Sequence, residues 1–211
     1  DGSTTITLST YRIDDTTVYV ADVQLSDISA LQTAFASSTY GKNVTAKTST
    51  IAAASNAVLA INGDYYGARN SGYVIRNGVL YRSTAQSSDQ EDLVILADGS
   101  FEIIQEGSVS AQNLLDQGAL DVFSFGPALV ENGAVSVSAD EEVDQAKTTN
   151  PRTAIAEISP LHYLFVVADG RTSESTGLSL YQMAQFLQGL GVTTAYNLDG
   201  GGSSTMVFNG T

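Results

Sequence analysis

The chain contains no cysteine, no tryptophan, three prolines and a single histidine among its 211 residues. Without cysteine the protein has no disulfide, no thiolate metal site and no cysteine nucleophile. A zinc site or a Ser-His-Asp triad would have to use His162. Its neighbours Pro160 and Tyr163 indicate instead an ordinary turn between two strands. The chain is nevertheless long enough to bury a core without such cross-links.

Positive charge is also scarce, since nine Lys and Arg stand against 23 Asp and Glu and the net charge is −14. A nucleic-acid-binding surface needs a basic footprint, so we expect no nucleic-acid partner. No apolar run approaches the length of a transmembrane helix, so we also expect no transmembrane segment. The sequence begins with Asp1 rather than Met, and we expect a secreted or cell-envelope bacterial protein whose signal peptide has been removed.

Turn dipeptides and alternating apolar residues predict a fold rich in hairpins. Asn77-Gly78 separates two β-prone runs, and Asp14-Asp15 separates two more. Helical spacing predicts four short helices, at 27–36, 50–57, 111–117 and 178–190. The acidic stretch 138–149 has no apolar period and is predicted to be an exposed loop. We therefore expect an α+β fold, a single compact domain with a mixed or largely antiparallel sheet and several short helices.

The most unusual segment is Asn197-Leu198-Asp199-Gly200-Gly201-Gly202-Ser203-Ser204, which lies between two apolar runs. Glycine loses the most backbone entropy on ordering, so an ordered run of three favours a functional site. A turn of this kind can aim successive N–H groups and hydroxyls into one concavity that suits an anion, with Asp199 at its edge. The alternative is a tight turn that Asp199 caps.

Two further loops repeat the same pattern of an apolar strand followed by an acid beside glycine. They are Ile61-Asn62-Gly63-Asp64 and Val167-Ala168-Asp169-Gly170-Arg171. If the three strand ends share one edge of a sheet, their carboxylates, Asn62 and Asn197, and at least one arginine converge there. Such a carboxylate cluster can bind a hard cation or carry out nucleophilic and acid–base chemistry. Taken singly, each Asp is equally consistent with an ordinary turn.

These motifs, in their order along the chain, resemble the phosphodiester glycosidase family. The resemblance rests on 61–66, the hairpin at 72–83, Phe125-Gly126-Pro127, Pro151-Arg152-Thr153-Ala154-Ile155, 167–171 and 197–204. Each motif alone is weak, but the combination is specific and covers nearly the whole chain from about Val18. We therefore divide the chain into an N-terminal strand region, residues 1–17, and a phosphodiester glycosidase-like domain, residues 18–211.

The resemblance implies hydrolysis of the glycosidic C1–O bond of an anionic sugar-1-phosphodiester, with release of a free sugar and a phosphomonoester. It implies a catalytic carboxylate, with Asp199 as the first choice and Asp64 and Asp169 next. The residues expected to bind substrate or phosphate are Arg152, Arg171, Thr153, Asn62, Asn197, Gly200, Gly201, Gly202, Ser203 and Ser204. Arginine side chains and backbone amides both suit a phosphate.

Two other functions stay open at this point. One is a metal-dependent phosphodiesterase that cleaves the P–O bond, with Asp64, Asp169 and Asp199 around Ca²⁺ or Mg²⁺, so a divalent cation is kept as an optional cofactor. The other is a non-catalytic envelope domain that binds glycans. The sequence does not determine the sugar, the aglycone, the stereochemical outcome or the oligomeric state.

Overall fold

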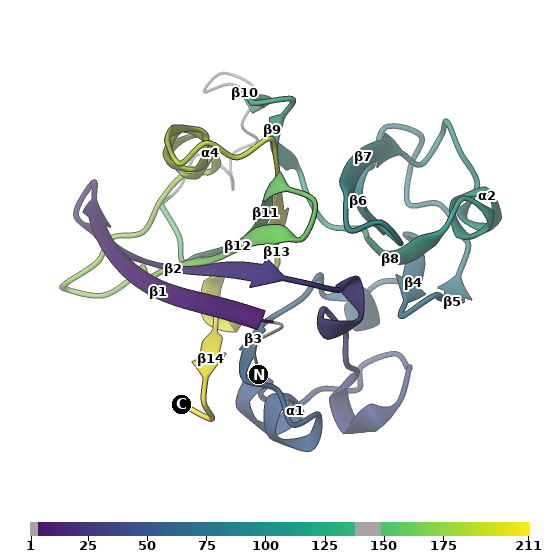
Figure 1. Ribbon diagram of the computed structural model, residues 1–211, viewed down its shortest axis with the longest axis horizontal. Helices are drawn as coiled ribbons and strands as arrows, with labels where there is room; N and C mark the ends of the chain where they lie inside the picture. The colour runs from purple at the N-terminus through teal and green to yellow at the C-terminus, as the bar shows by residue number, and fades with distance from the viewer. Residues whose placement is uncertain (1–3, 138–148) are drawn as a thin grey trace.

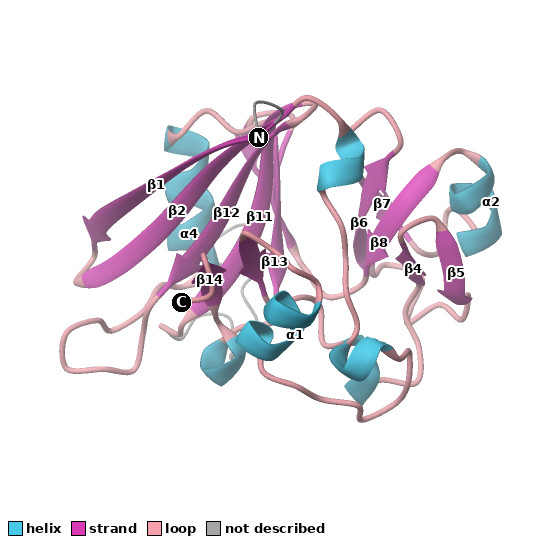
Figure 2. Ribbon diagram, turned by 60° about the horizontal axis from the view of Figure 1, so that its bottom comes forward, coloured by secondary structure: helices cyan, strands magenta, loops and turns pink. Residues whose placement is uncertain are grey.

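The structure, a computed structural model, describes residues 4–137 and 149–211, and its strands form three sheets (Figures 1 and 2). The seven-stranded sheet has the order β1 (Thr4–Ile13), β2 (Thr16–Leu25), β12 (His162–Ala168), β11 (Arg152–Ser159), β13 (Thr194–Leu198), β9 (Ala128–Glu131) and β10 (Ala134–Val135). The five-stranded sheet has the order β5 (Val79–Arg82), β4 (Val74–Arg76), β8 (Ala119–Phe123), β6 (Glu91–Leu96) and β7 (Phe101–Gln105). The third is a ribbon of β14 (Met206–Phe208) and β3 (Leu59–Ile61).

Every strand pairing within the described residues is antiparallel, which confirms the largely antiparallel sheet. The strands outweigh the helices, so the fold is more strongly β than the α+β prediction implied. Asp14 and Asp15 both have positive φ and form the tight turn between β1 and β2. β1 is thus an edge strand of the larger sheet, and a domain boundary at residue 17 stays a prediction.

Three α-helices and four 3-10 turns complete the described elements. They are α1 (Thr48–Ala54), α2 (Ala111–Asp116) and α4 (Leu180–Gly189), with η1 (Ile28–Ala30), η2 (Ala36–Ser38), η3 (Tyr66–Ala68) and η4 (Gly201–Ser203). The helix predicted for 27–36 is wrong, because only one turn forms and the backbone extends from Leu31. There the Thr33 N–H donates to Asn77 Oδ1 at 3.1 Å rather than to a helical carbonyl. The loop predicted at 138–149 lies almost wholly outside the described residues.

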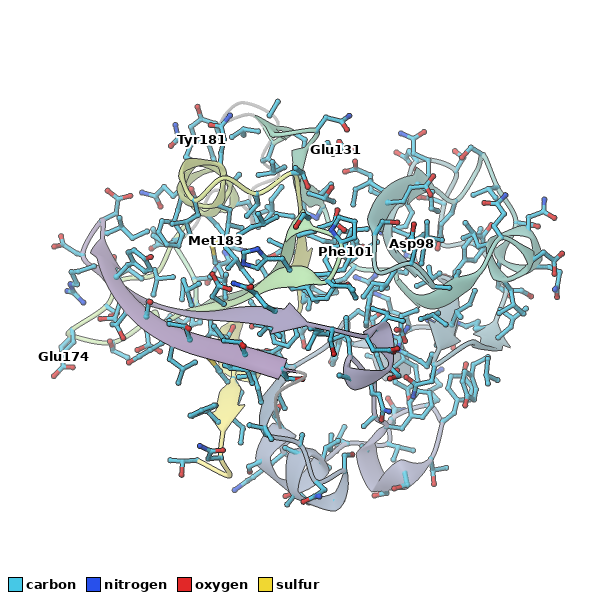
Figure 3. All side chains as sticks on the ribbon, in the orientation of Figure 1. Asp98, Phe101, Glu131, Glu174, Tyr181 and Met183 are labelled. Carbon is cyan, nitrogen blue, oxygen red and sulfur yellow. The ribbon has the colours of Figure 1, made fainter. Side chains whose placement is uncertain are left out.

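The elements stack in layers, with α4 on one face of the seven-stranded sheet and the five-stranded sheet beside the other face (Figure 1). Strand alternation divides the larger sheet between two cores. Ala154 and Ala156 face α4, whereas Ile155 faces the five-stranded sheet. Figure 3 labels one residue of each of these two cores, Met183 of α4 and Phe101 of β7. A third core joins α2 to the five-stranded sheet.

Candidate active site

The loops singled out in the sequence lie close together at one edge of the seven-stranded sheet. β12 and β13 end at the same edge of this sheet, where β11 begins, because Arg152 pairs with Ala168 and Thr153 pairs with Leu198. The prediction that all three strands share this edge is corrected, since β3 belongs to the ribbon. Its loop nevertheless reaches the glycine loop, where the Asp199 N–H donates to the Gly63 carbonyl at 3.0 Å.

The side chain of Asn62 ties three segments together. Its Nδ2 donates to the Asp199 carbonyl at 2.5 Å. Its Oδ1 accepts hydrogen bonds from Thr153 Oγ1 at 2.7 Å and from the Thr205 N–H at 3.1 Å. The predicted binding residues Asn62 and Thr153 are therefore brought together, and they hold β11 and both ends of the glycine loop in register.

Asp199 is half-buried at the centre of this junction. Burial raises the pKa of its carboxyl group. Hydrogen bonds from the Ser203 side chain and the Gly200 backbone lower this pKa, as does the positive charge of Arg69, while the charge of Asp64 raises it. Asp199 is therefore a partly desolvated carboxylate whose ionised form has hydrogen-bond donors and a nearby cation, the environment of a group that can react.

Asp64 is close enough to raise the pKa of Asp199, but its own side chain is buried and both of its oxygens accept hydrogen bonds. Its Oδ1 accepts from Arg76 Nη2 at 2.7 Å and its Oδ2 accepts from the Ser124 N–H at 3.0 Å. The Arg76 guanidinium also lies over the Phe123 ring, 4.5 Å from its centroid. A buried pair of this kind is costly to break, because the remaining charge would have no partner. The ion pair anchors the segment that carries Asn62.

Asp169 follows β12 and lies at the same edge of the sheet, with β11 between it and Asp199. Strands are spaced by about 4.8 Å, so the two backbones are separated by roughly 10 Å. Asp169 is not among the groups that shift the pKa of Asp199. Among the residues that the structure describes, no three Asp, Glu or His side chains form a group that could hold a metal ion. The metal-binding trio of Asp64, Asp169 and Asp199 is thus not assembled here.

The glycine loop is tightly packed rather than open. The N–H of Gly201 donates to the Pro151 carbonyl, and those of Ser203 and Ser204 donate to carbonyls within the loop. These three amides are therefore engaged, and they do not form the free anion-binding concavity that the sequence suggested. A Cβ on Gly200 would lie 2.8 Å from the Pro151 carbonyl oxygen, and Gly201 has a φ of +60°. Contact of Gly202, Ser203 and Ser204 with substrate stays a prediction.

The two arginines predicted to bind phosphate differ in position. Arg171 is exposed, and its guanidinium approaches Gly201, whose added Cβ would lie 3.5 Å from Nη1. It also donates through Nε and Nη2 to Asn150 Oδ1. Arg152 is buried, and its Nε donates to the Leu178 carbonyl at 2.9 Å. Neighbouring residues of a strand face opposite sides, so Arg152 cannot share the direction of Thr153 toward Asn62.

Asn197 was also predicted to bind substrate, and the structure places it inside the protein. It is 4% exposed, and its Nδ2 donates to the Gly126 carbonyl at 3.0 Å. The backbone N–H of Gly126 donates in return to the Asn197 carbonyl at 3.2 Å. Asn197 therefore fixes the turn at Gly126-Pro127 against the end of β13.

Arg69 is the site residue that the sequence analysis missed. Its Nη1 donates to the Ser124 carbonyl at 3.1 Å, its guanidinium lies over the Phe125 ring, and its charge acts on Asp199. A signal was present in the sequence, because residues 28–88 hold five of the nine Lys and Arg but only one of the 23 Asp and Glu, Asp64. This segment is a basic region in a strongly acidic chain.

A separate hollow of about 100 Å³ lies beside α1 and away from these residues. Its lining includes Phe35, Ser37, Thr50 and Ile51, and none of the predicted site residues. The chemistry of the junction around Asp199, rather than the shape of this hollow, therefore identifies the candidate site.

Comparison with known proteins identifies the family of this chain. Residues 55–211 match the phosphodiester glycosidase family. The chain is 31% identical over 159 residues to the SPbeta prophage-derived uncharacterized protein YomE of Bacillus subtilis (strain 168), covering 72% of this chain and 24% of that protein. It is 31% identical over 179 residues to the Homo sapiens N-acetylglucosamine-1-phosphodiester alpha-N-acetylglucosaminidase, covering 76% of this chain and 33% of that protein. The chain therefore belongs to the phosphodiester glycosidase family, as the resemblance predicted.

Solved structures show the same fold at low sequence identity. The zebrafish N-acetylglucosamine-1-phosphodiester alpha-N-acetylglucosaminidase catalytic domain, auto-inhibited by its pro-peptide, aligns with a TM-score of 0.72 at 21% identity over 99% of this chain and 74% of that chain. A hypothetical protein from Synechocystis aligns with a TM-score of 0.66 at 18% identity over 100% of this chain and 58% of that chain. The chain spans about a quarter to a third of the length of the YomE and human relatives. Within its described residues, no helix is long and apolar enough to cross a membrane.

Proposed function

We propose that this protein hydrolyses the glycosidic C1–O bond of a sugar-1-phosphodiester and releases a free sugar and a phosphomonoester. The observation that carries the proposal is Asp199, a half-buried carboxylate beside Arg69 and the glycine loop. The name of the human relative supports N-acetylglucosamine as the first sugar to test. A secreted or cell-envelope location, also a proposal, would expose the enzyme to such substrates.

The proposed leaving group explains the need for cations. A phosphomonoester is far less basic than a sugar alkoxide, so its departure needs charge stabilisation more than a strong general acid. The charge of Arg69 acts on Asp199, and the Arg171 guanidinium approaches Gly201 in the same loop. A guanidinium group can bind a phosphate through two parallel N–H···O bonds, so these two arginines are the proposed phosphate ligands.

Asp199 is the proposed catalytic carboxylate at the anomeric carbon. As a nucleophile, it would form a bond to C1 while the C1–O bond to phosphate breaks, and water would then release the sugar. As a base, it would take a proton from the water that attacks C1 directly. Either role requires ionised Asp199. Asp64 is instead proposed to position the loop, because both of its oxygens already accept hydrogen bonds.

Asp169 is retained as the second carboxylate of the proposal. Glycosidases commonly use two carboxylates, and their separation determines whether the configuration at C1 is retained or inverted. Asp169 lies at the edge of the sheet that carries the site, but within the described parts of the chain its side chain makes no hydrogen bond to another candidate residue. Product configuration, followed by NMR during turnover in wild type and Asp169→Asn, would determine whether this residue acts in the reaction.

The proposed reaction is tested by the fate of isotopic water and by Asp199→Asn. Hydrolysis in ¹⁸O-labelled water should place the label in the sugar, whereas a phosphodiesterase would place it in the phosphate. Asp199→Asn should lower kcat by about 100-fold or more, because the amide cannot act as nucleophile or base. Asp98→Asn, in an exposed turn of the five-stranded sheet, is the matched control and should retain wild-type kcat. Label in phosphate, or normal turnover by Asp199→Asn, would refute the proposal.

A further inference from the structure

Two buried carboxyl groups lie near the candidate site. One is on a strand of the five-stranded sheet, and the other is in the loop after β7. Asp92 on β6 is 0% exposed, and Glu106 after β7 is 3% exposed. Glu106 accepts three hydrogen bonds, from the Tyr73 N–H at 2.8 Å, the Gln86 N–H at 2.6 Å and Ser124 Oγ at 3.2 Å. Both oxygens of Asp92 are buried without a donor. The mechanism proposed above uses neither group.

A proton on Asp92 accounts for the difference in hydrogen bonding between the two carboxyl groups. Glu106 already accepts three hydrogen bonds, whereas an ionised Asp92 would be a buried charge with no donor at hydrogen-bond distance. A proton on Asp92 converts its carboxyl group into an O–H donor toward Glu106 and removes the repulsion. Burial first, and then the hydrogen bond and charge of Glu106, raise the pKa of Asp92 to about 10, and the Ser124 side chain opposes this rise. At neutral pH Asp92 is therefore protonated, and its O–H can donate to Glu106.

Ser124 connects this pair to the site through three separate groups. Its Oγ donates to Glu106, and its backbone N–H donates to Asp64 Oδ2 at 3.0 Å. Its carbonyl accepts from Arg69 Nη1 at 3.1 Å. The packing at Ser124 is close, since a Cβ on Gly72 would lie 2.6 Å from Ser124 Oγ. The position of the Arg69 guanidinium therefore depends on how Ser124 is held.

We infer that Ser124 is a positioning residue for the phosphate site, and that the Asp92–Glu106 pair fixes it there. The inference rests on the proposed function, because it assigns Arg69 to the substrate phosphate. The pair holds the Ser124 side chain, Ser124 presents its carbonyl to Arg69, and Arg69 is thereby directed to the region beside Asp199. Breaking the chain of contacts at Ser124 should weaken anion binding without removing any group that touches the substrate.

The test measures affinity for inorganic phosphate by calorimetry, which needs no turnover. Arg69→Ala should weaken binding about 10-fold, and Ser124→Ala about 3- to 10-fold. The double variant should bind within about twofold of Arg69→Ala alone, since coupled residues are not additive. Ser136→Ala is the control, because the half-buried Ser136 side chain donates a hydrogen bond to the Ala128 carbonyl at 2.8 Å and belongs neither to the Arg69 segment nor to the loop of Arg171. It should retain wild-type affinity.

Variants of Asp92 test the shared proton. In Asp92→Asn the amide N–H replaces the carboxyl O–H toward Glu106, so phosphate affinity should stay within about twofold of wild type. In Asp92→Leu the donor is lost and affinity should fall about as far as in Ser124→Ala. Melting temperatures on the same samples separate unfolding from displacement of Arg69, since the control serine variant also loses a side-chain hydrogen bond.

Several outcomes would overturn the inference. These are unchanged phosphate affinity in Ser124→Ala or in Arg69→Ala, additive losses in the double variant, and equal losses in Asp92→Asn and Asp92→Leu. The failure of the proposed reaction is distinguishable from these results. A protein that binds phosphate with the expected pattern of variants, but releases no sugar from a sugar-1-phosphodiester, refutes the hydrolase while supporting the positioning of Arg69.

Discussion

At the scale of single residues, the candidate site depends on opposing effects on the pKa of Asp199. Burial raises its pKa, whereas Arg69 and two hydrogen-bond donors lower it. The carboxyl group is thus only partly hydrated, while a cation and two donors favour its ionised form. Its neighbour Asp64 has the opposite character, because the Arg76 guanidinium and the Ser124 N–H occupy its oxygens. Chemical identity alone does not distinguish these two aspartates; their surroundings do.

The Arg69 charge gives a pH prediction for the reaction. Removing a cation that favours ionised Asp199 raises the pKa of this carboxyl group further. Because activity requires the ionised form, the acidic limb of the kcat/KM profile should move to higher pH in Arg69→Ala. Arg69→Lys keeps a positive charge and should leave the limb near that of wild type. An acidic limb at the wild-type pH in Arg69→Ala would show that this charge does not act on the catalytic carboxylate.

At the scale of elements, the turns between strands follow local chemistry. Asn77 and Gly78 both have positive φ, as the mirror-image turn of a two-residue hairpin requires. The capping box of α4 is another local device, in which Ser179 and Gln182 exchange side-chain and backbone hydrogen bonds. The glycine loop differs from both, since its conformation depends on Pro151, which directly precedes β11. Its three glycines are therefore not equivalent.

The geometry of the glycine loop predicts different costs at neighbouring positions. Gly201→Ala places a side chain at a φ of +60°, which should destabilise the protein by roughly 1–2 kcal/mol. Gly202→Ala is the matched control, because its Cβ would meet nothing within 4 Å, and it should change stability by less than about 0.5 kcal/mol. Urea denaturation of both variants measures the difference. Equal stability of the two variants would contradict the observed backbone conformation.

At the scale of the whole molecule, the site lies where parts of different sheets meet. The seven-stranded sheet supplies Asp199, the ribbon leads into Asn62, and residues near the five-stranded sheet supply Arg69 and Ser124. The two larger sheets share a core, which includes Leu93 and Ile95 of β6 on one side and strands of the seven-stranded sheet on the other. A disturbance in the five-stranded sheet can therefore reach Arg69 through packed structure rather than through a hinge.

The protonated Asp92 also affects the stability of the molecule as a whole. Its pKa is about 10 in the folded protein, against an ordinary value of 3.8. Folding therefore takes up a proton between these pH values, and the free energy of unfolding should fall as pH rises through this window. Asp92→Asn needs no such proton, so it should be more stable than wild type at pH 8 by about 1 kcal/mol or more, with a smaller difference near pH 4.

Urea denaturation of wild type and Asp92→Asn at several pH values measures this effect. Glu157 and Asp121 also have raised pKa values because of burial, so some pH dependence should remain in the variant. The useful quantity is therefore the difference between the two proteins at each pH. A difference that is constant from pH 4 to pH 8 would show that Asp92 is ionised in the folded protein.

The sequence by itself determined the features that depend on a few neighbouring residues. The Asp14-Asp15 and Asn77-Gly78 turns and the amphipathic helix α4 were predictable, because turn conformation and helical periodicity are local properties. The order of the motifs was sufficient to predict the family, and the loops of Asn62 and Asp199 were correctly singled out as partners. The helix predicted at 27–36 does not form, and the Thr33 N–H donates to the side chain of Asn77, which is distant in the sequence.

Only the tertiary structure decided which polar groups are engaged and which face the site. The burial of Asp64 with Arg76, the engagement of the Gly201 N–H by Pro151, and the approach of Arg69 to Asp199 all join residues from separate segments. No periodicity or turn dipeptide encodes such contacts, because they depend on how sheets and loops pack against one another. The sequence identifies each ionisable residue, but burial and the neighbours that folding brings together determine its pKa and its partner.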